Sequence, residues 1–234
     1  MPYCILCKTY SLKFESFNNR SGVGCPNCHS AERHRLFGYY YEKYIAYKKN
    51  LSVLHFAPET CLHSLLKLTV SNYICGDLDP AKFPDKQCVQ LDATQLPFPP
   101  QSFDLILASH ILEHIPDDIK ALSEMRRVLK PKGILIVLIP QNFSLETTDE
   151  DPNVVLPEDR VERFGQADHV RTYGLDFGRK LKEAGFSVKA YAPHSRLLDV
   201  EKMGLDSVMN IADESTVRDN KFSPWDVLYE CTKN

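Results

Sequence analysis

The sequence predicts an α/β protein with a doubly wound, mostly parallel sheet and a small metal-binding module at the N-terminus. From Leu51 onward, short apolar runs alternate with segments of helical periodicity, which is typical of parallel strands connected by helices. Two Cys-x-x-Cys pairs precede this region, in a stretch too short to bury a core of its own. The 234 residues, 43% of them hydrophobic, suffice for one main domain and a small appendage.

The N-terminal module is predicted from four cysteines. The pairs are Cys4/Cys7 and Cys25/Cys28, and seventeen residues separate them. Two thiolates of one pair on a tight turn can face the same ion, and two such turns complete the tetrahedral sulfur shell of structural zinc. We therefore expect a zinc-ribbon module over residues 1–30, with no coordination position left for water. A redox pair or two disulfides is the alternative interpretation.

A helix over residues 31–49 is expected to connect the module to the main domain, because Leu36, Tyr40, Tyr44 and Tyr47 recur at helical spacing. Further helices are predicted at 61–68, 117–129 and 173–184. The predicted strands are LSVLHF (51–56), NYICGD (72–77), QCVQLD (87–92), FDLILASH (103–110), ILIVLIP (134–140), FSVKAYA (186–192) and WDVLYECTK (225–233). The last two are expected to form a hairpin-like pair joined by residues 193–223.

A long polar segment, residues 141–172, is rich in charge and has no clear period. A connection of this length inside a compact domain is usually functional, so we expect it to cover or form a binding site. Its arginines, Arg160, Arg163 and Arg171, either clamp an anionic acceptor or neutralise the acidic residues of the same segment.

The composition predicts a soluble protein of the reducing cytoplasm. No apolar stretch approaches the roughly twenty residues that a membrane helix requires. The net charge is −3, and residues 1–50 carry eight Lys and Arg against three Asp and Glu, which leaves about −8 for the rest. The basic N-terminal part could meet phosphate, although a solvated helix face is the simpler interpretation.

Distinctive residues follow four of the predicted strands, at the edge where open parallel sheets bind ligands. They are His55-Phe56-Ala57-Pro58-Glu59, Asp77-Leu78-Asp79-Pro80, Asp92-Ala93, and Ser109-His110 leading into Leu112-Glu113-His114. A carboxylate after the second strand can accept hydrogen bonds from both vicinal hydroxyls of a ribose, which favours Asp77, with Asp79 second. Asp-x-Asp-Pro is also an ordinary turn sequence whose carboxylates cap backbone amides.

In chain order, these motifs resemble those of the class I S-adenosylmethionine-dependent methyltransferases, especially the type 11 group. The resemblance covers about residues 51–140 and is carried by VLHFAPE, YICGDLDP, LDATQLPFPPQSFDLILASHILEHIPDD and LSEMRRVLKPKGILIVLIP. With CPNCHSAERHR and EDP…ERFGQADHVRTYG, the chain further resembles a bacterial subgroup with a zinc-ribbon front end. The resemblance implies a Rossmann-like methyltransferase fold of seven strands over residues 50–234.

The resemblance also implies contacts to the cofactor S-adenosylmethionine. The turn from His55 to Glu59 should approach its methionine part, Asp77 should hold the ribose, and Leu78 should pack on the adenine. The remaining implied contacts are Asp92 and Ala93 at the adenine amino edge, and Ser109 and His110 near the sulfonium.

One departure from the family concerns its glycine-rich first loop, where this chain has Ala57, Pro58 and Glu59. Glycine lets backbone amides come close to a ligand, whereas alanine and proline restrict that approach. Glu59 is expected to repel the carboxylate of the cofactor and to attract its amino group.

Methyl transfer to a hydroxyl or amine needs three atoms in line and a route for the departing proton. His169 is the first candidate for the general base, because the neighbouring carboxylate of Asp168 can orient an imidazole and raise its basicity. His114 is the rival candidate, and a packing or helix-start role is its alternative interpretation.

These observations predict methyl transfer from S-adenosylmethionine to an oxygen or nitrogen of a small or carbohydrate-type acceptor. Structured RNA, bound by the basic zinc module, is a second hypothesis, which the acidic balance of residues 51–234 disfavours. A third is a non-catalytic, methyltransferase-like binding protein that uses the zinc module as an interaction surface.

Overall fold

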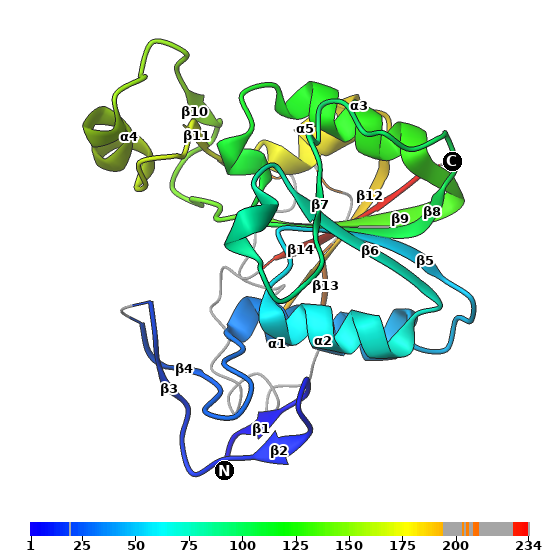
Figure 1. Ribbon diagram of the computed structural model, residues 1–234. Helices are drawn as coiled ribbons and strands as arrows, with labels where there is room; N and C mark the ends of the chain where they lie inside the picture. The colour runs from blue at the N-terminus through cyan, green and yellow to red at the C-terminus, as the bar shows by residue number, and fades with distance from the viewer. Residues whose placement is uncertain (19, 194–202, 204, 206–207, 211–226, 234) are drawn as a thin grey trace.

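A computed structural model describes residues 1–18, 20–193, 203, 205, 208–210 and 227–233 (Figure 1). The central sheet has the strand order β13-β12-β14-β9-β8-β5-β6-β7. Its strands are β5 (Ser52–Phe56), β6 (Asn72–Asp77), β7 (Val89–Gln90), β8 (Phe103–Ser109), β9 (Leu129–Leu138), β12 (Ser187–Ala192), β13 (Val208–Asn210) and β14 (Leu228–Thr232). Only β14 runs antiparallel to its neighbours. The mostly parallel sheet of seven predicted strands is confirmed, and β13 adds a short strand at one edge.

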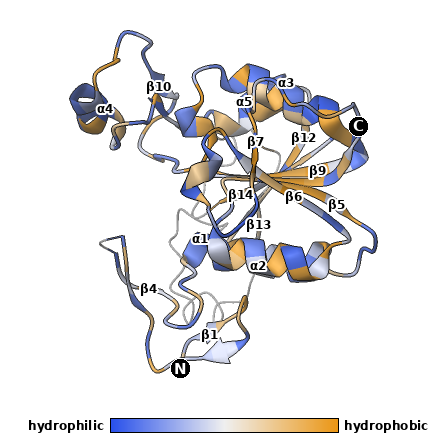
Figure 2. Cartoon of the chain, in the orientation of Figure 1, coloured by the Kyte–Doolittle hydropathy of each residue, from blue (hydrophilic) through white to orange (hydrophobic). Residues whose placement is uncertain are grey.

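Helices cover both faces of this sheet. The helices α1 (Glu32–Tyr44) and α2 (Thr60–Thr69) lie on one face, and α3 (Asp118–Val128) and α5 (Phe177–Glu183) lie on the other (Figure 1). Because both faces are covered, the central strands carry continuous apolar runs, and Figure 2 shows them mostly in hydrophobic colours. All residues of β8 except Asp104 are buried.

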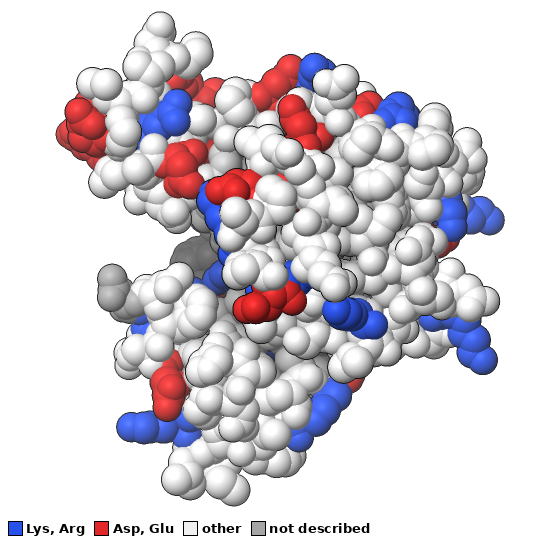
Figure 3. Space-filling view, viewed as in Figure 1, with Lys and Arg blue, Asp and Glu red and all other residues white. Residues whose placement is uncertain are grey.

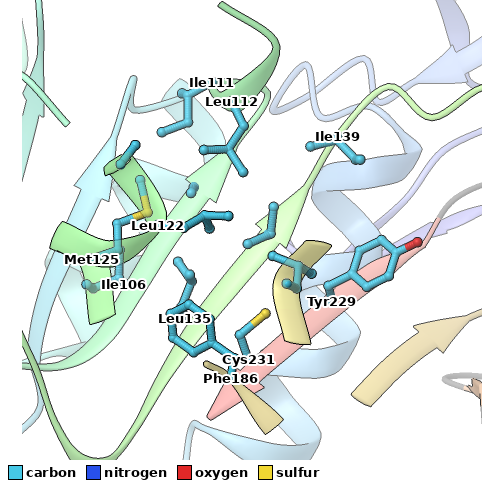
Figure 4. Close-up of a cluster of buried hydrophobic side chains, with 14 of the residues drawn as sticks. Ile106, Ile111, Leu112, Leu122, Met125, Leu135, Ile139, Phe186, Tyr229 and Cys231 are labelled. Atoms are coloured by element: carbon cyan, nitrogen blue, oxygen red, sulfur yellow. The ribbon is translucent and has the colours of Figure 1, made fainter. Parts of the chain in front are cut away.

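The larger core cluster fills the space between the sheet and the helices α3 and α5 (Figure 4). Leu122 and Met125 of α3 are fully buried there, and Tyr229 of β14 brings a polar group into the same layer. The hydroxyl of Tyr229 donates to the side-chain oxygen of Gln141 at 2.7 Å, which anchors the start of segment 141–172 to the sheet. The core thus fixes one end of that segment next to the carboxyl end of β9.

The polar segment 141–172 is more regular than its sequence indicates. It contains the hairpin strands β10 (Asp149–Glu150) and β11 (Arg171–Thr172) and the helix α4 (Pro157–Phe164). Proline occupies the first turn of α4, and Gly165 ends the helix in the left-handed conformation at φ 86°. An eight-residue helix spans little more than two turns, which is too short to produce a recognisable period.

The N-terminal module consists of two hairpins, β1 (Tyr3–Cys4) with β2 (Thr9–Tyr10) and β3 (Glu15–Phe17) with β4 (Arg20–Gly24). It packs closely on α1, since a Cβ on Gly38 would lie 2.8 Å from side-chain carbons of both Ile5 and Leu6. The buried guanidinium of Arg35 donates to the Ser30 carbonyl at 2.6 Å and lies 4.3 Å from the centre of the Phe14 ring.

Two boundaries differ from the sequence expectations. The connecting helix ends at Tyr44, five residues before the expected end, and Tyr47 is 71% exposed. The expected helix at 173–184 begins only at Phe177, because Tyr173 continues from the short strand β11 and is buried. The connection expected over 193–223 lies mostly outside the described residues. Among the described residues, no helix combines the length and apolarity needed to cross a bilayer.

Candidate active site and metal centre

The four predicted metal ligands converge in the N-terminal module. The Sγ atoms of Cys4 and Cys28 are 3.6 Å apart, as are those of Cys7 and Cys25, and all four lie within 4.8 Å of one another. Four sulfurs at about 2.3 Å from a tetrahedral zinc ion would be about 3.8 Å apart. All four are free thiols. Their arrangement is compatible with zinc, and the two Cys-x-x-Cys motifs lie together as expected.

Hydroxyl groups surround the sulfur cluster. Thr9 Oγ1 lies 3.0 Å from the sulfur of Cys7, and Ser30 Oγ lies 3.3 Å from the sulfur of Cys4. Groups of this kind orient metal-binding thiolates and compensate part of their charge. Ser30 also begins the short segment that leads to α1, so this segment connects the sulfur cluster to the main domain.

The turn after β5 contains no glycine but adopts a backbone conformation that favours glycine. Ala57 adopts φ 44° in the left-handed region, and its amide donates to the Gly76 carbonyl at 2.9 Å. An alanine in this region costs roughly 1 kcal/mol or more, so the surrounding contacts must hold the turn in place. His55 is fully buried and contacts the Tyr73 hydroxyl at 2.9 Å.

Glu59 lies at the centre of a polar cluster. Ser109 Oγ donates to its Oε1 at 2.9 Å, His34 Nε2 lies 3.1 Å from the same oxygen, and Arg33 Nε lies 3.7 Å away. The Ala31 amide donates to Nδ1 of His34 at 2.9 Å, which places the imidazole proton on Nε2, facing the carboxylate. The helix α1, the turn after β5 and the end of β8 therefore meet at one carboxylate.

Burial lowers the pKa of His34. Burial alone would raise the pKa of Glu59, but the hydrogen bonds from His34 and His55 outweigh it and hold this pKa well below its ordinary range. Both directions agree with a neutral His34 that donates to an ionised Glu59. Glu59 thus carries its negative charge next to the positively charged Arg33.

This pair predicts a loss of stability in acid. Below pH about 6.5 the unfolded chain takes up a proton on His34 that the folded protein resists, and below about 4.5 the same holds for Glu59. The free energy of unfolding should therefore decrease as the pH falls through both windows. His34→Asn, which cannot take up this proton, should flatten the decrease between pH 6.5 and 4.5 in urea titrations. Equal slopes for the two proteins would contradict the assignment.

The acidic residues after β6 and β7 cap backbone amides. Asp77 Oδ1 accepts from the Asp79 amide at 2.8 Å, and Asp79 Oδ1 accepts from the Ala81 amide at 3.2 Å. Asp92 Oδ1 accepts from both the amide and the hydroxyl of Thr94. The turn interpretation is therefore correct for Asp77 and Asp79, and Asp92 makes a similar cap. A binding role stays open for all three, because these bonds hold the side chains at the sheet edge.

Leu78 lies beside Asp77 and is 67% exposed. An exposed apolar side chain next to a carboxylate at the end of a strand offers a platform for a flat apolar ring and an acceptor for hydroxyl groups. Ala93 is almost completely buried and belongs to the larger core cluster. The expected nucleoside surface, from Asp77 to Ala93, thus lies along one edge of the sheet.

A cavity of about 510 Å³ opens at the carboxyl ends of β8 and β9. Figure 3 shows the surface hollowed between the N-terminal module and the part of the chain that carries α4. The cavity is lined by Asn18, Arg20, Arg33, His110, Glu113, His114, Leu138, Ile139, Pro140, Gln141, Gln166, His169 and Val227. The module, α1, the sheet and segment 141–172 all contribute to it.

His114 and His169, the two candidate bases, both line this cavity. The carboxylate of Asp168 contacts His114, however, and not His169 as expected. Asp168 Oδ2 lies 3.2 Å from Nδ1 of His114, whereas His169 Nδ1 lies 3.1 Å from the Phe164 carbonyl. The expected orientation of His169 by Asp168 is wrong, because the exposed Asp168 and the buried His169 point in different directions. The rings of His114 and His169 meet edge to face with their centres 4.7 Å apart.

Glu113 is a site residue to which the sequence analysis assigned no role, although it lies in one of the motifs named there. Its side chain is 1% exposed, neither carboxylate oxygen has a hydrogen-bond partner, and Oε1 lies 3.3 Å from Nδ1 of His110. The residue belongs to the short 3-10 helix η2 (Leu112–His114), directly after β8. In the sequence, Glu113 lies between His110 and His114 directly after a predicted strand, and this position could have indicated a site residue.

Arg171 fastens segment 141–172 to η2. Its guanidinium is 4% exposed and donates to the carbonyls of Leu112 at 3.0 Å and Pro116 at 2.8 Å, and also to that of Ile115. Its Nε donates to Glu150 Oε2 at 2.9 Å. Arg171 is therefore no clamp for an acceptor. It neutralises an acid of its own segment, as the alternative expectation held, and it also positions the cavity wall.

Comparison with known proteins supports this architecture. Residues 53–137, which include β5 to β9, match the family model described as "Methyltransferase domain". Over this segment the chain is similar to methyltransferase domains, and we call residues 53–137 the methyltransferase domain for this similarity. The match ends at β9, so the N-terminal module and segment 141–172 lie outside it.

Curated relatives match a short part of the methyltransferase domain. A ubiquinone/menaquinone biosynthesis C-methyltransferase, UbiE, of Pseudoalteromonas translucida is 52% identical over 50 residues, which are 21% of this chain and 20% of the relative. A demethylmenaquinone methyltransferase of Staphylococcus epidermidis is 41% identical over 63 residues, 27% of this chain and 26% of the relative. The chain thus matches about a fifth to a quarter of the length of these relatives.

Solved structures share the fold over most of the chain. A SAM-dependent methyltransferase from Archaeoglobus fulgidus superposes with a TM-score of 0.55 at 20% identity, covering 87% of this chain and 95% of that one. The [4+2]-cyclase SpnF reaches 0.56 at 16% identity, covering 97% and 89%. These likenesses confirm the Rossmann-like methyltransferase fold. The cyclase has the same fold but is named for a different reaction, so the fold alone does not determine the reaction.

Proposed function

We propose that the protein is an S-adenosylmethionine-dependent methyltransferase that acts on an oxygen or nitrogen of a small, polar acceptor of carbohydrate type. The observation that carries this proposal is the cavity at the carboxyl edge of the methyltransferase domain. Nine of its thirteen lining residues are polar or charged, and three of these are histidines. A hydroxylated acceptor fits such a lining better than the quinones named for the curated relatives.

The residues at the sheet edge fit the donor. Asp77 and the exposed Leu78 offer a ribose acceptor and an apolar platform for adenine. The ionised Glu59 and the neighbouring Arg33 present opposite charges 3.7 Å apart, matching the amino and carboxylate groups of a methionine moiety. Glu59 replaces a glycine of the family loop, and this charge pair supplies an attraction that the glycine lacks. When bound, the donor supplies a methyl group on a positively charged sulfur.

His110 is the residue we propose as the proton acceptor. It follows Ser109 at the end of β8, lines the cavity, and has Nδ1 3.3 Å from the buried carboxylate of Glu113. A carboxylate on one ring nitrogen orients an imidazole so that the other nitrogen can take a proton. A second group of titratable side chains lies at the same cavity and consists of His114, Asp168 and His169.

We also propose that Cys4, Cys7, Cys25 and Cys28 hold a structural zinc ion. Its module contributes Asn18 and Arg20 to the cavity lining, so zinc would maintain one wall of the acceptor site. Arg20 also pairs with Glu32, the first residue of α1, and therefore serves the attachment of the module. This pairing reduces the positive charge available for RNA, the second hypothesis.

Calorimetry with S-adenosylmethionine and S-adenosylhomocysteine tests the proposal. Both should bind, and Asp77→Ala should weaken binding by about 1.5–3 kcal/mol, or roughly 10- to 150-fold, because it removes charge-assisted hydrogen bonds to the ribose. Asp85→Ala is the matched control, since Asp85 is an exposed acid of the same region outside the proposed contacts.

Two outcomes would contradict these assignments. Absence of binding by both compounds at millimolar concentration would leave the non-catalytic, methyltransferase-like binding protein as the remaining hypothesis. Unchanged affinity in Asp77→Ala, with normal binding by the wild type, would remove the ribose assignment alone.

A further inference from the structure

A second group of metal-ligand side chains lies in the cavity, far in sequence from the cysteines. Glu113, His114 and His169 each offer one ligand atom, and these atoms lie within 4.8 Å of one another. Two imidazoles and one carboxylate that leave further positions open suit divalent first-row transition ions. We propose that these three residues bind such an ion, and that the ion takes an oxygen of the acceptor as a further ligand.

The first observation behind this proposal is the environment of Glu113. A carboxylate that is 1% exposed and has no hydrogen-bond partner on either oxygen is costly unless a cation compensates it. Nδ1 of His110 lies 3.3 Å from Oε1. A divalent ion bound to this carboxylate would supply the missing compensation.

The second observation is the set of partners of the two histidines. Nδ1 of His114 faces the carboxylate of Asp168 at 3.2 Å, and Nδ1 of His169 faces the Phe164 carbonyl at 3.1 Å. Metal-bound histidines usually donate one ring N–H to a carboxylate or carbonyl, which leaves the other nitrogen for the metal. Here both rings have that arrangement, so Nε2 of each is the nitrogen available to an ion.

The third observation is the rigidity of the cluster. Glu113 and His114 belong to η2 and His169 to segment 141–172, and Arg171 joins the two through hydrogen bonds to backbone carbonyls. The Val170 amide also donates to the Glu113 carbonyl at 2.9 Å. Ligands from two separate segments are thus held together by contacts that do not involve the ligand atoms.

This role rests on the proposed function, because the ion would act on the methyl acceptor. A divalent ion bound to a hydroxyl oxygen lowers the pKa of that hydroxyl and orients it. The O–H bond would then break with transfer of the proton to His110, and the oxygen would use the remaining electron pair to form a bond to the methyl carbon. The bond between this carbon and the sulfur of the donor would break, its electron pair would return to sulfur, and S-adenosylhomocysteine would leave. Asp168 is in this scheme a positioning residue for His114.

Mn²⁺ titration of the full chain, with its cysteine site loaded with zinc, tests the proposal. Mn²⁺ prefers oxygen and nitrogen ligands, so the thiolates should not compete for it. The loss of the free Mn²⁺ signal in electron paramagnetic resonance should indicate one bound ion per chain. Glu113→Gln and His114→Asn should each weaken binding at least tenfold, and Asp168→Asn should weaken it less than either.

His63→Gln is the matched control, because His63 is a buried histidine that contacts the Tyr73 hydroxyl at 3.0 Å and does not line the cavity. It should bind Mn²⁺ as the wild type does. His114 is one-third exposed, so its variant should fold even if Glu113→Gln does not, and circular dichroism checks both.

The proposal is overturned if the wild type binds no Mn²⁺ at millimolar concentration, or if folded His114→Asn binds it with wild-type affinity. Donor calorimetry on the same wild-type sample separates this result from failure of the proposed function. Donor binding without Mn²⁺ binding rejects the metal site alone, whereas Mn²⁺ binding without donor binding rejects the methyltransferase proposal.

Discussion

Replacing Cys25 with serine is expected to abolish binding of the proposed zinc ion and unfold residues 1–30, while the α/β domain stays folded. The buried cluster of the module consists of Cys4, Phe14 and Cys25, so the core without metal is far too small to be stable. Zinc binding by comparable small modules contributes about 10–16 kcal/mol at pH 7, most of which the variant should lose. Among the described parts of the molecule, this substitution should have the largest local effect.

Two measurements check this expectation. Elemental analysis should show the zinc content falling from about one ion per chain to near zero, and hydrogen exchange should show lost protection in residues 1–30. The acceptor should also bind more weakly, because Asn18 and Arg20 would leave the cavity wall. Cys61→Ser is the control, since Cys61 lies in α2 outside the cluster. Retained zinc and unchanged exchange in Cys25→Ser would refute the metal assignment.

The second large effect is expected for Arg171→Met. The substitution removes one donor from each of the carbonyls of Leu112 and Pro116 and one partner from Glu150, in a place where the guanidinium is almost completely buried. The guanidinium also lies 3.7 Å from the buried carboxylate of Asp118. Removing one member of a buried ion pair typically costs about 3–5 kcal/mol, and we expect about this loss in the free energy of unfolding. Segment 141–172 should also detach from η2, which would weaken binding at the cavity.

Urea unfolding of wild type and variant measures the loss. Arg163→Met is the matched control, because Arg163 belongs to the same segment and pairs with Asp149 and Asp151 at the surface. It should change the unfolding midpoint far less, since surface ion pairs are screened by solvent. Similar midpoint shifts for the two variants would mean that Arg171 does not carry the anchoring role.

The secondary structure of the methyltransferase domain follows from local patterns. Strands such as β8 and β9 are continuous apolar runs, and α3 begins at a capping aspartate, Asp117, whose side chain accepts from the Lys120 amide. The spacing of the two cysteine pairs likewise suffices to predict the sulfur cluster. These features depend on residues close together in the chain, which is why the sequence is enough to predict them.

The site could be predicted only in part. Asp77, Leu78 and Glu59 are placed at the sheet edge by the strands that precede them, so their general position was predictable. The contacts of Glu59 with His34 and Arg33 were not, because they depend on how α1 docks against the turn after β5. A sequence also does not show which way neighbouring side chains point, and this is why Asp168 was assigned to His169 and not to His114.

By itself, the sequence determined the order of strands and helices, the sulfur cluster and the edge of the sheet that carries the candidate binding residues. Only the tertiary structure decided that one cavity lies between the N-terminal module and the sheet, and that Glu113 and two histidines meet inside it. The physical reason is that the first set arises from short-range periodicity and spacing. The second depends on the packing of distant segments, fixed here by Gly38 against the module and by the hydrogen bonds of Arg171.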